Sequence, residues 1–242
     1  MTKKPTSPGI TSWSFSRFVT YTQCPAKARY QFVLKIPEPG NEAMARGDKI
    51  HKLIEAYLRG ESSRLASELQ LVGSELKALR AQFKRQKLLA PLIEEMWGFD
   101  REWQQVAWND WTNCWLRIKL DLAYFDGPDA LIMVDWKTGK LRPEEAETYL
   151  AQLELYVLGA FLRFPHLTAV TPRLHYVDLG VTYPVVPSTY TRADLERLKK
   201  LWAGRVAPMM RDKAFAPRPN NRCQWCHYRK ANAANGGGQC RF

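Results

Sequence analysis

The feature that most constrains the fold is an apolar run, Leu131–Val134, that leads directly into Asp135, Trp136 and Lys137. Such a run predicts a strand buried within a sheet, which requires other elements to cover the sheet. Side chains alternate along a strand, so Asp135 and Lys137 point to the same side. A carboxylate and an ammonium group therefore lie side by side at the end of a rigid element, either as a salt bridge or as a functional site.

Periodicity, caps and turn residues predict the elements around this strand. The expected helices cover residues 12–31 with a break at Pro25, 41–59 ending at Gly60, 74–90, a short piece around 90–99, a long segment from Pro143, and 191–210 opened by Thr191 and Asp194. The expected strands cover 101–108, 113–125, 129–137 and 172–187, with a turn at 126–129. This order predicts an α/β fold with a central mixed sheet flanked by helices. We expect a flexible terminus over 1–10, one domain over 11–215, and a cysteine-rich segment over 216–242.

The charge balance indicates an anionic partner. The chain has 36 Lys and Arg against 24 Asp and Glu, a net charge of +12. Nucleic acid is the first candidate, an acidic membrane surface the second, and a merely basic protein the third. No apolar run of the length of a membrane span and no apolar leader segment are visible, so we expect no membrane-spanning segment and no signal peptide. A nucleic acid, and not a membrane, is the partner we expect. Five cysteines without such a leader favour a reducing, cytoplasmic setting.

A second acid accompanies the first. Asp121 lies on the strand before the hairpin, fourteen residues before Asp135, so that the turn can bring the two carboxylates together. Two carboxylates that close repel unless a proton or cation lies between them, and Mg²⁺ or Mn²⁺ suits oxygen ligands. A metal-bound water of lowered pKa attacks phosphodiesters, and Lys137 would assist. The competing interpretation is that Asp135 and Lys137 form an ordinary surface pair.

Two helices carry polar residues on faces that are otherwise apolar. Gln152 and Tyr156 are four residues apart and share a face of the helix that follows the strand. His51 lies among Ile50 and Leu53, and therefore faces or borders the core. A lone inward histidine is usually a satisfied core residue, but one that meets two carboxylates is a candidate metal ligand.

Taken in order, these motifs resemble the PD-(D/E)xK nuclease superfamily. G-x-x-x-H ends at His51, an isolated acid follows at Asp121, D-x-K joins Asp135 to Lys137, and Q-x-x-x-Y joins Gln152 to Tyr156. More narrowly, the chain resembles the RecB-like exonuclease branch, which includes stand-alone phage exonucleases and CRISPR-associated Fe–S exonucleases. The acid of the D-x-K motif is often Glu in this superfamily.

The resemblance implies a restriction-endonuclease-like core and assigns roles to these residues. The implied metal ligands are His51, Asp121, Asp135 and the Trp136 carbonyl. Lys137 becomes the catalytic lysine. Gln152 and Tyr156 become active-site residues that position the lysine, the metal ligands or the DNA.

Four of the five cysteines follow the layout of the family's Fe–S members. The resemblance implies that a [4Fe–4S] cluster ties the two ends of the fold together through Cys24, Cys223, Cys226 and Cys240. The same residues also suit Zn²⁺, either with four cysteines or with three and His227, and free thiols are the third interpretation. Cys114 is expected to be an ordinary core or sheet residue.

Basic residues cluster on predicted helices and in the tail. We expect Lys84, Arg85, Lys87 and Arg229 to follow a phosphate backbone, although each alone would usually be a solvated charge. Tyr21, Trp225 and Tyr228 are candidates for stacking on bases or, equally, for core packing. No base-reading module is visible, so we expect little sequence specificity.

The sequence therefore predicts a metal-dependent DNA exonuclease. Its substrates would be single strands or duplex ends, and its role phage DNA processing, recombination or repair. The alternatives are a CRISPR spacer-processing exonuclease, a non-catalytic DNA-binding subunit that keeps the fold, and a zinc-stapled nucleic-acid-binding protein. A recombination or CRISPR adaptation partner and an oligomeric assembly are compatible with each of these.

Overall fold

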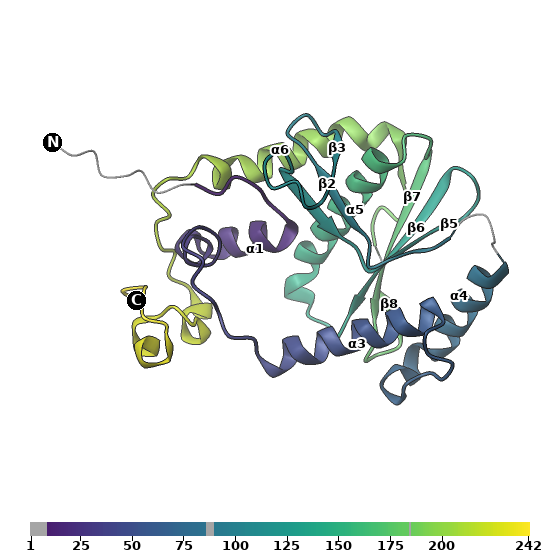
Figure 1. The fold of residues 1–242 in the computed structure, drawn as a ribbon, viewed down its shortest axis with the longest axis horizontal. Helices are drawn as coiled ribbons and strands as arrows, with labels where there is room; N and C mark the ends of the chain where they lie inside the picture. The colour runs from purple at the N-terminus through teal and green to yellow at the C-terminus, as the bar shows by residue number, and fades with distance from the viewer. Residues whose placement is uncertain (1–8, 86–89, 184) are drawn as a thin grey trace.

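A computed structural model describes residues 9–85, 90–183 and 185–242. Its central feature is a six-stranded mixed sheet in the order β1-β5-β6-β7-β8, with β9 paired to β7 (Figure 1). The strands are β1 Leu92–Ile93, β5 Leu122–Phe125, β6 Ala130–Lys137, β7 Ala169–Tyr176, β8 Val181–Tyr183 and β9 Tyr190–Thr191. β6 and β7 are parallel and the other pairs antiparallel. The predicted mixed α/β architecture is confirmed.

Helices cover both faces of this sheet. They are α1 Phe15–Gln23, α2 Pro25–Ala28, a π-helix Arg29–Val33, α3 Glu42–Arg59, α4 Gly73–Arg85, α5 Ala146–Arg163 and α6 Leu195–Arg211. Short 3-10 helices span Ser67–Val72, Pro143–Glu145, Arg192–Asp194, Asn221–Trp225 and Lys230–Asn235. Among the helices of the described ranges, none has the length and apolar character needed to cross a membrane.

The strand β6 is buried on both faces, as the apolar run predicts. Ile132 and Val134 pack with α3 and α4, whereas Leu131 and Met133 pack with α5 and α6. The alternation places Asp135 on the α5 side of the sheet. The end of the strand therefore delivers polar groups between two packed layers.

Most predicted caps and turns are present. Gly60 ends α3 with a φ of 83°, as expected, and Asn41, a cap that was not predicted, accepts from the Met44 amide at the start of that helix. Thr191 and Asp194 form the expected capping box ahead of α6. The Asp126 amide donates to the Ala130 carbonyl in the hairpin turn. The predicted helix over 74–90 is observed as α4 up to Arg85, and residues 86–89 lie outside the described ranges.

Two predictions in the middle of the chain are wrong. The short helix expected around 90–99 is instead two strands, β1 and β2 Met96–Phe99. The single strand expected over 113–125 is also two, β4 Leu116–Lys119 and β5. β2 and β4 pair with each other and, together with β3 Gln105–Val106, form a separate three-stranded sheet. Pairing between distant segments overrides local helix propensity here.

The first described segment is anchored to this small sheet. The Trp13 amide donates to the Trp115 carbonyl at 2.7 Å, and the Trp13 carbonyl accepts from the Arg117 amide at 2.9 Å. The Trp13 ring is fully buried and stacks on Trp202 of α6, with ring centroids 5.5 Å apart. One residue thus joins the entering chain, the small sheet and α6.

The C-terminal segment returns to the N-terminal helices, where Figure 1 shows it beside α1. Asn220 Nδ2 donates to the Gln23 carbonyl at 3.1 Å, and the Tyr30 hydroxyl donates to the Gln239 carbonyl at 2.8 Å. The Tyr228 hydroxyl donates to the Ile36 carbonyl at 2.9 Å, and its ring is fully buried. Chain ends that are far apart in sequence therefore form one lobe.

Replacing Trp13 with alanine should lower the free energy of unfolding by about 3–5 kcal/mol, because it empties a fully buried aromatic site. Urea unfolding followed by circular dichroism measures this loss. Trp111→Ala is the matched control: that ring is 77% exposed, and its removal should cost less than about 1 kcal/mol. Equal losses in the two variants would contradict the anchoring role of Trp13.

Candidate active site

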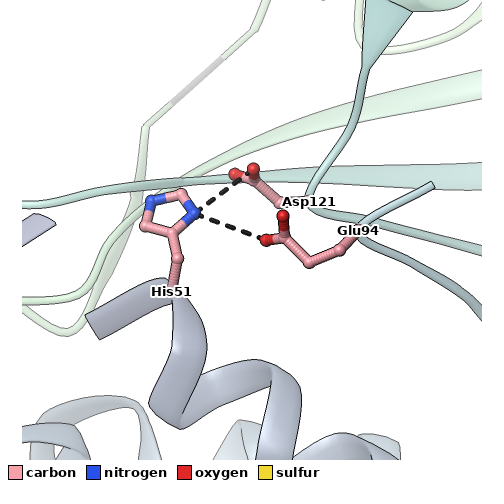
Figure 2. A group of neighbouring side chains, drawn as sticks. All are labelled: His51, Glu94 and Asp121. Carbon is pink, nitrogen blue, oxygen red and sulfur yellow. Dashed lines mark ion pairs between the residues drawn. The ribbon is translucent and has the colours of Figure 1, made fainter. Parts of the chain in front are cut away.

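A histidine and two acids from three separate elements meet at one end of the central sheet (Figure 2). His51 Nδ1 lies 3.3 Å from Asp121 Oδ1 and 3.8 Å from Glu94 Oε1. One ligand atom from each residue lies within 4.8 Å of the other two. His51 comes from α3, Glu94 follows β1, and Asp121 separates β4 from β5.

The two acids lie where a strand pair passes from one sheet into the other. β1 pairs with β5 in the large sheet, and β2 pairs with β4 in the small one. Between these pairings, the Glu94 amide donates to the Asp121 carbonyl at 2.9 Å, and the Leu120 amide donates to the Glu95 carbonyl at 3.0 Å. Glu94 takes a left-handed φ of 54°, which is uncommon for a residue other than glycine. We call this break in the ladder the seam, and it presents both carboxylates to His51.

The charges at the seam indicate a site for a cation. Burial lowers the pKa of His51, but hydrogen bonding to Asp121 and Glu94 outweighs burial and raises it to about 10. Burial raises the pKa of Glu94, but hydrogen bonds from His51 and Lys119 outweigh that effect and lower it. The Lys119 ammonium lies 2.5 Å from Glu94 Oε2. Without another cation, the carboxylates thus hold a proton on the imidazole.

Asp135 adds a further carboxylate beside the seam. Its residue is 2% exposed, and burial together with the charge of Asp121 raises its pKa despite the ammonium of Lys137. Its buried Oδ2 lies 2.7 Å from Lys137 Nζ, an ion pair that lacks the alignment of a hydrogen bond. Asp121 Oδ2 accepts from the Trp136 amide at 2.8 Å, which fixes the first acid against the strand that carries the second.

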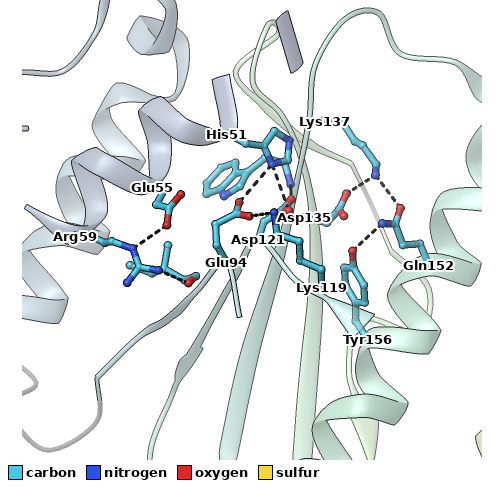
Figure 3. A network of polar contacts seen from close by, with 12 residues as sticks. His51, Glu55, Arg59, Glu94, Lys119, Asp121, Asp135, Lys137, Gln152 and Tyr156 are labelled. Atoms are coloured by element: carbon cyan, nitrogen blue, oxygen red, sulfur yellow. Dashed lines mark hydrogen bonds and ion pairs between the residues drawn. The ribbon is translucent and has the colours of Figure 1, made fainter. Parts of the chain in front are cut away.

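A chain of hydrogen bonds leads from the lysine into α5 (Figure 3). Lys137 Nζ donates to Gln152 Oε1 at 2.8 Å, and Gln152 Nε2 donates to the Tyr156 hydroxyl at 2.7 Å. Nζ also lies 5.0 Å from the centroid of the Tyr149 ring. Burial, and then the nearby charges of Asp135 and Asp121, raise the pKa of Tyr156 well above its ordinary value. Tyr156 therefore keeps its proton, and Lys137 is held in one position.

Two cavities flank these residues. The first, of about 690 Å³, reaches His51, Glu94 and Asp121 from the side of α3. The second, of about 450 Å³, reaches Gln152 and Tyr156. Lys119 lines both cavities.

A third cavity, of about 220 Å³, lies in the lobe formed by the chain ends. It is lined by Cys24, Cys223, Cys226 and Cys240. No three of these thiols are as tightly grouped as the residues at the seam, among the residues that the structure describes. His227 is not among the described residues that line the cavity, and Cys114 is buried elsewhere, 2% exposed, as expected.

The predicted phosphate-contacting residues do not form one group. Lys84 and Arg85 are exposed at the end of α4, and Lys87 lies outside the described residues. Arg229 is half-buried and lines the cysteine cavity. Of the candidate stacking residues, Tyr228 is fully buried, and Tyr21 donates its hydroxyl to Asp212 at 2.9 Å.

Glu94 is the site residue that sequence reasoning missed. It stands in a segment that local patterns assign to a helix, and another acid, Glu95, follows directly. The useful signal would have been pairing: β2 lies opposite β4, so an acid just before β2 must lie near the acid just after β4. That argument requires the strands to be recognised first.

Glu94→Gln should weaken Mn²⁺ binding by at least about tenfold, because it removes one of three converging ligand groups. Glu95→Gln supplies a matched control, since it changes the neighbouring carboxylate and should shift the dissociation constant less than twofold. Calorimetric titration of both variants and the parent protein measures the effect. Equal losses in both would mean that only the overall charge matters.

A crystal structure of a candidate exonuclease from Eubacterium rectale is similar over 93% of this chain and 88% of its own, at 9% identity and a TM-score of 0.47. The crystal structure of SSO0001 is similar over 90% and 84%, at 14% identity and a TM-score of 0.41. Both similarities are too distant to indicate a function. No curated protein has a matching sequence. The model of the PD-(D/E)XK nuclease superfamily matches residues 12–231, and the chain therefore belongs to this superfamily of hydrolytic nucleases, which use divalent metal ions.

Proposed function

We propose that the protein is a metal-dependent DNA exonuclease that hydrolyses phosphodiester bonds in single strands or at duplex ends. The observation that carries the proposal is the convergence of the His51–Glu94–Asp121 group with the Asp135–Lys137–Gln152 network at one end of the sheet. Its role in phage DNA processing, recombination or repair is part of the proposal and rests on the resemblance.

The residues present fit a hard divalent cation, Mg²⁺ or Mn²⁺. The carboxylates of Asp121 and Glu94 raise the pKa of His51 to about 10, so they favour a positive charge at this place, and the imidazole would release its proton on binding the metal ion. His51, Glu94, Asp121 and Asp135 would bind the cation, with the Trp136 carbonyl as a further ligand, since oxygen donors predominate in this set. A bound cation of this kind lowers the pKa of its water and neutralises charge on a phosphate.

The remaining residues position and balance charge. Lys137 is fixed between Asp135 and Gln152, so its side chain does not need to change rotamer before its ammonium can face a reacting phosphate or water. The Tyr156 hydroxyl accepts from Gln152 Nε2 and so holds the amide in place, and its raised pKa keeps the hydroxyl neutral. A non-catalytic DNA-binding subunit has no need of this network, which favours the enzyme.

The net charge of +12 supports a nucleic acid as the substrate. Lys119 places a cation between the two cavities beside the site. Phosphate contacts of this kind carry no sequence information, so we expect cleavage without sequence preference.

Lys137→Met should lower kcat on end-labelled DNA by at least about a hundredfold, as the loss of one positioned charge does in other enzymes. Binding of the same DNA should change less than about twofold. Lys140→Met is the matched control, because Lys140 is an exposed lysine of the loop that follows β6 and its replacement should leave kcat unchanged. The product ladder also gives the polarity. DNA that the parent binds with Mg²⁺ or Mn²⁺ but never cuts would overturn the proposed function.

We also propose that the cysteine cavity holds a [4Fe–4S] cluster. Four thiols line one cavity large enough for several atoms, about seven times the volume of a water molecule in the liquid. The lining also includes Lys27, Arg218, Arg222 and Arg229, and no acid among the described lining residues, which suits a group with negative charge. A single Zn²⁺ requires sulfurs about 3.8 Å apart, from the Zn–S length and tetrahedral geometry. The thiols here are spread more widely.

Cys24→Ser should abolish the brown visible absorption of protein purified without oxygen and lower its iron content. Cys114→Ser, a change of the one cysteine outside the cavity, should leave both unchanged. Absorption spectra with iron and zinc analysis of both variants and the parent decide the matter. If the parent protein is colourless and contains one equivalent of zinc, the cavity holds a zinc ion and the cluster proposal is wrong.

A further inference from the structure

The cavity beside Gln152 and Tyr156 combines aromatic and cationic side chains. Among its described lining residues are Trp108, Trp111, Arg17, Arg117 and Lys119, and none is acidic. A cavity that opens onto catalytic residues and presents both rings and positive charge suits an anion that also carries a flat apolar group. A nucleotide has both of these parts.

Trp111 is unusual because it is exposed and yet held in place. It is 77% exposed, on the loop that leads into β4. The guanidinium carbon of Arg117 lies 4.5 Å from the centroid of its ring. One face of the indole is therefore occupied by a cation, which leaves the exposed remainder of the ring to solvent.

Arg117 is itself locked. It is 7% exposed, and its guanidinium donates to the carbonyls of Trp108 at 3.0 Å, Asp110 at 3.3 Å and Cys114 at 3.3 Å. Hydrogen bonds to three backbone carbonyls of one loop fix the position of this buried guanidinium, whatever the conformation of the Trp111 ring. It acts as a fixed support.

The loop around Trp111 is also tied down. Asp110 Oδ1 accepts from the amides of Thr112 and Asn113 at 3.0 and 2.9 Å, and Oδ2 accepts from Asn113 Nδ2 at 2.9 Å. These bonds bracket the tryptophan in sequence. The indole is therefore held in place before any ligand arrives, and a flat partner that covers its open face would remove apolar area from water.

We propose that Trp111 stacks on an unpaired base of the strand whose phosphate lies at the catalytic group. Arg17 and Lys119 then face the sugar–phosphate backbone on the way to the seam. Stacking on an aromatic ring accepts every base, in agreement with cleavage without sequence preference. This inference rests on the proposed nuclease function and narrows its substrate.

The geometry selects single-stranded DNA. A base inside a duplex has both faces covered by its neighbours and cannot stack on a protein ring without leaving the helix. The enzyme therefore takes strands that are already single, or ends that fray. Blunt duplexes bind without this contact.

The test measures binding of short single-stranded DNA by fluorescence anisotropy. All variants carry Asp135→Asn, so that the DNA is not cleaved during the measurement, and the protein with this change alone is the background protein. Trp111→Ala should bind about tenfold more weakly, and Trp111→Phe, which keeps a ring, within about threefold of the background protein. Leu71→Ala removes an exposed apolar side chain that lines neither cavity, and should have no effect. Thermal unfolding of each variant shows that it is folded.

The specific evidence is a scan in which one base at a time is removed from the DNA while its sugar and phosphates remain. Loss of one particular base should weaken binding about tenfold in the background protein, and should add nothing in Trp111→Ala, because the stack is already absent. Equal effects of base removal in both proteins would overturn the inference. So would Trp111→Ala binding single strands as tightly as the background protein.

Cleavage by the protein with native Asp135 separates the two proposals. If it degrades DNA and Trp111→Ala does so with the same KM and kcat on single strands, the stacking site is wrong and the nuclease stands. If the native protein degrades no DNA but the base scan couples to Trp111, the nuclease proposal fails and the stacking site stands. With both correct, Trp111→Ala raises KM for single strands about tenfold, with kcat and blunt-duplex KM nearly unchanged.

Discussion

The site depends on the seam, the place where one pair of strands leaves the large sheet and joins the small one. The two pairings keep one register across the seam, so Glu94 stands opposite Asp121, and residues directly opposite on antiparallel strands point to the same face. The hydrogen bonds between Glu94 and Asp121, and between Leu120 and Glu95, keep the chains together while the pairing changes sheet. The left-handed conformation of Glu94 is the local cost of this arrangement. The seam thereby places the carboxylates of Glu94 and Asp121 beside His51, which comes from the helix α3.

Relations between residues that are close in sequence could be predicted, whereas relations between distant segments could not. The spacing of Asp135 and Lys137 depends on a period of two, and the pairing of Gln152 with Tyr156 on a helical turn, so both relations are local and both are present in the structure. The helix stop at Gly60 and the capping box at Thr191 are equally local. Local rules therefore sufficed for the residues of the D-x-K strand and of α5.

The remainder required information about pairing between distant segments. The assignment of 90–99 as a helix failed because its two-residue and four-residue strands are stabilised by β5 and β4, whose paired residues lie 17 to 31 positions further along the chain. For the same reason, Glu94 was not predicted as a site residue. The cysteine cavity was expected only through the resemblance, because no local rule brings residue 24 beside residue 223. Nothing in the sequence distinguishes Trp111 from other loop tryptophans, because its contact with Arg117 depends on how the loop folds back on β4.

The rigid connection from Arg117 to Asp121 has a consequence for the products. Arg117 supports the proposed base platform, and four residues later, through β4, the chain reaches an acid of the catalytic group. A strand of that length spans about 13 Å and does not stretch. The separation between the stacked base and the bond that breaks would then be set by backbone geometry, as on a ruler. Fragments released from a single strand would accordingly share a common length, whatever their sequence.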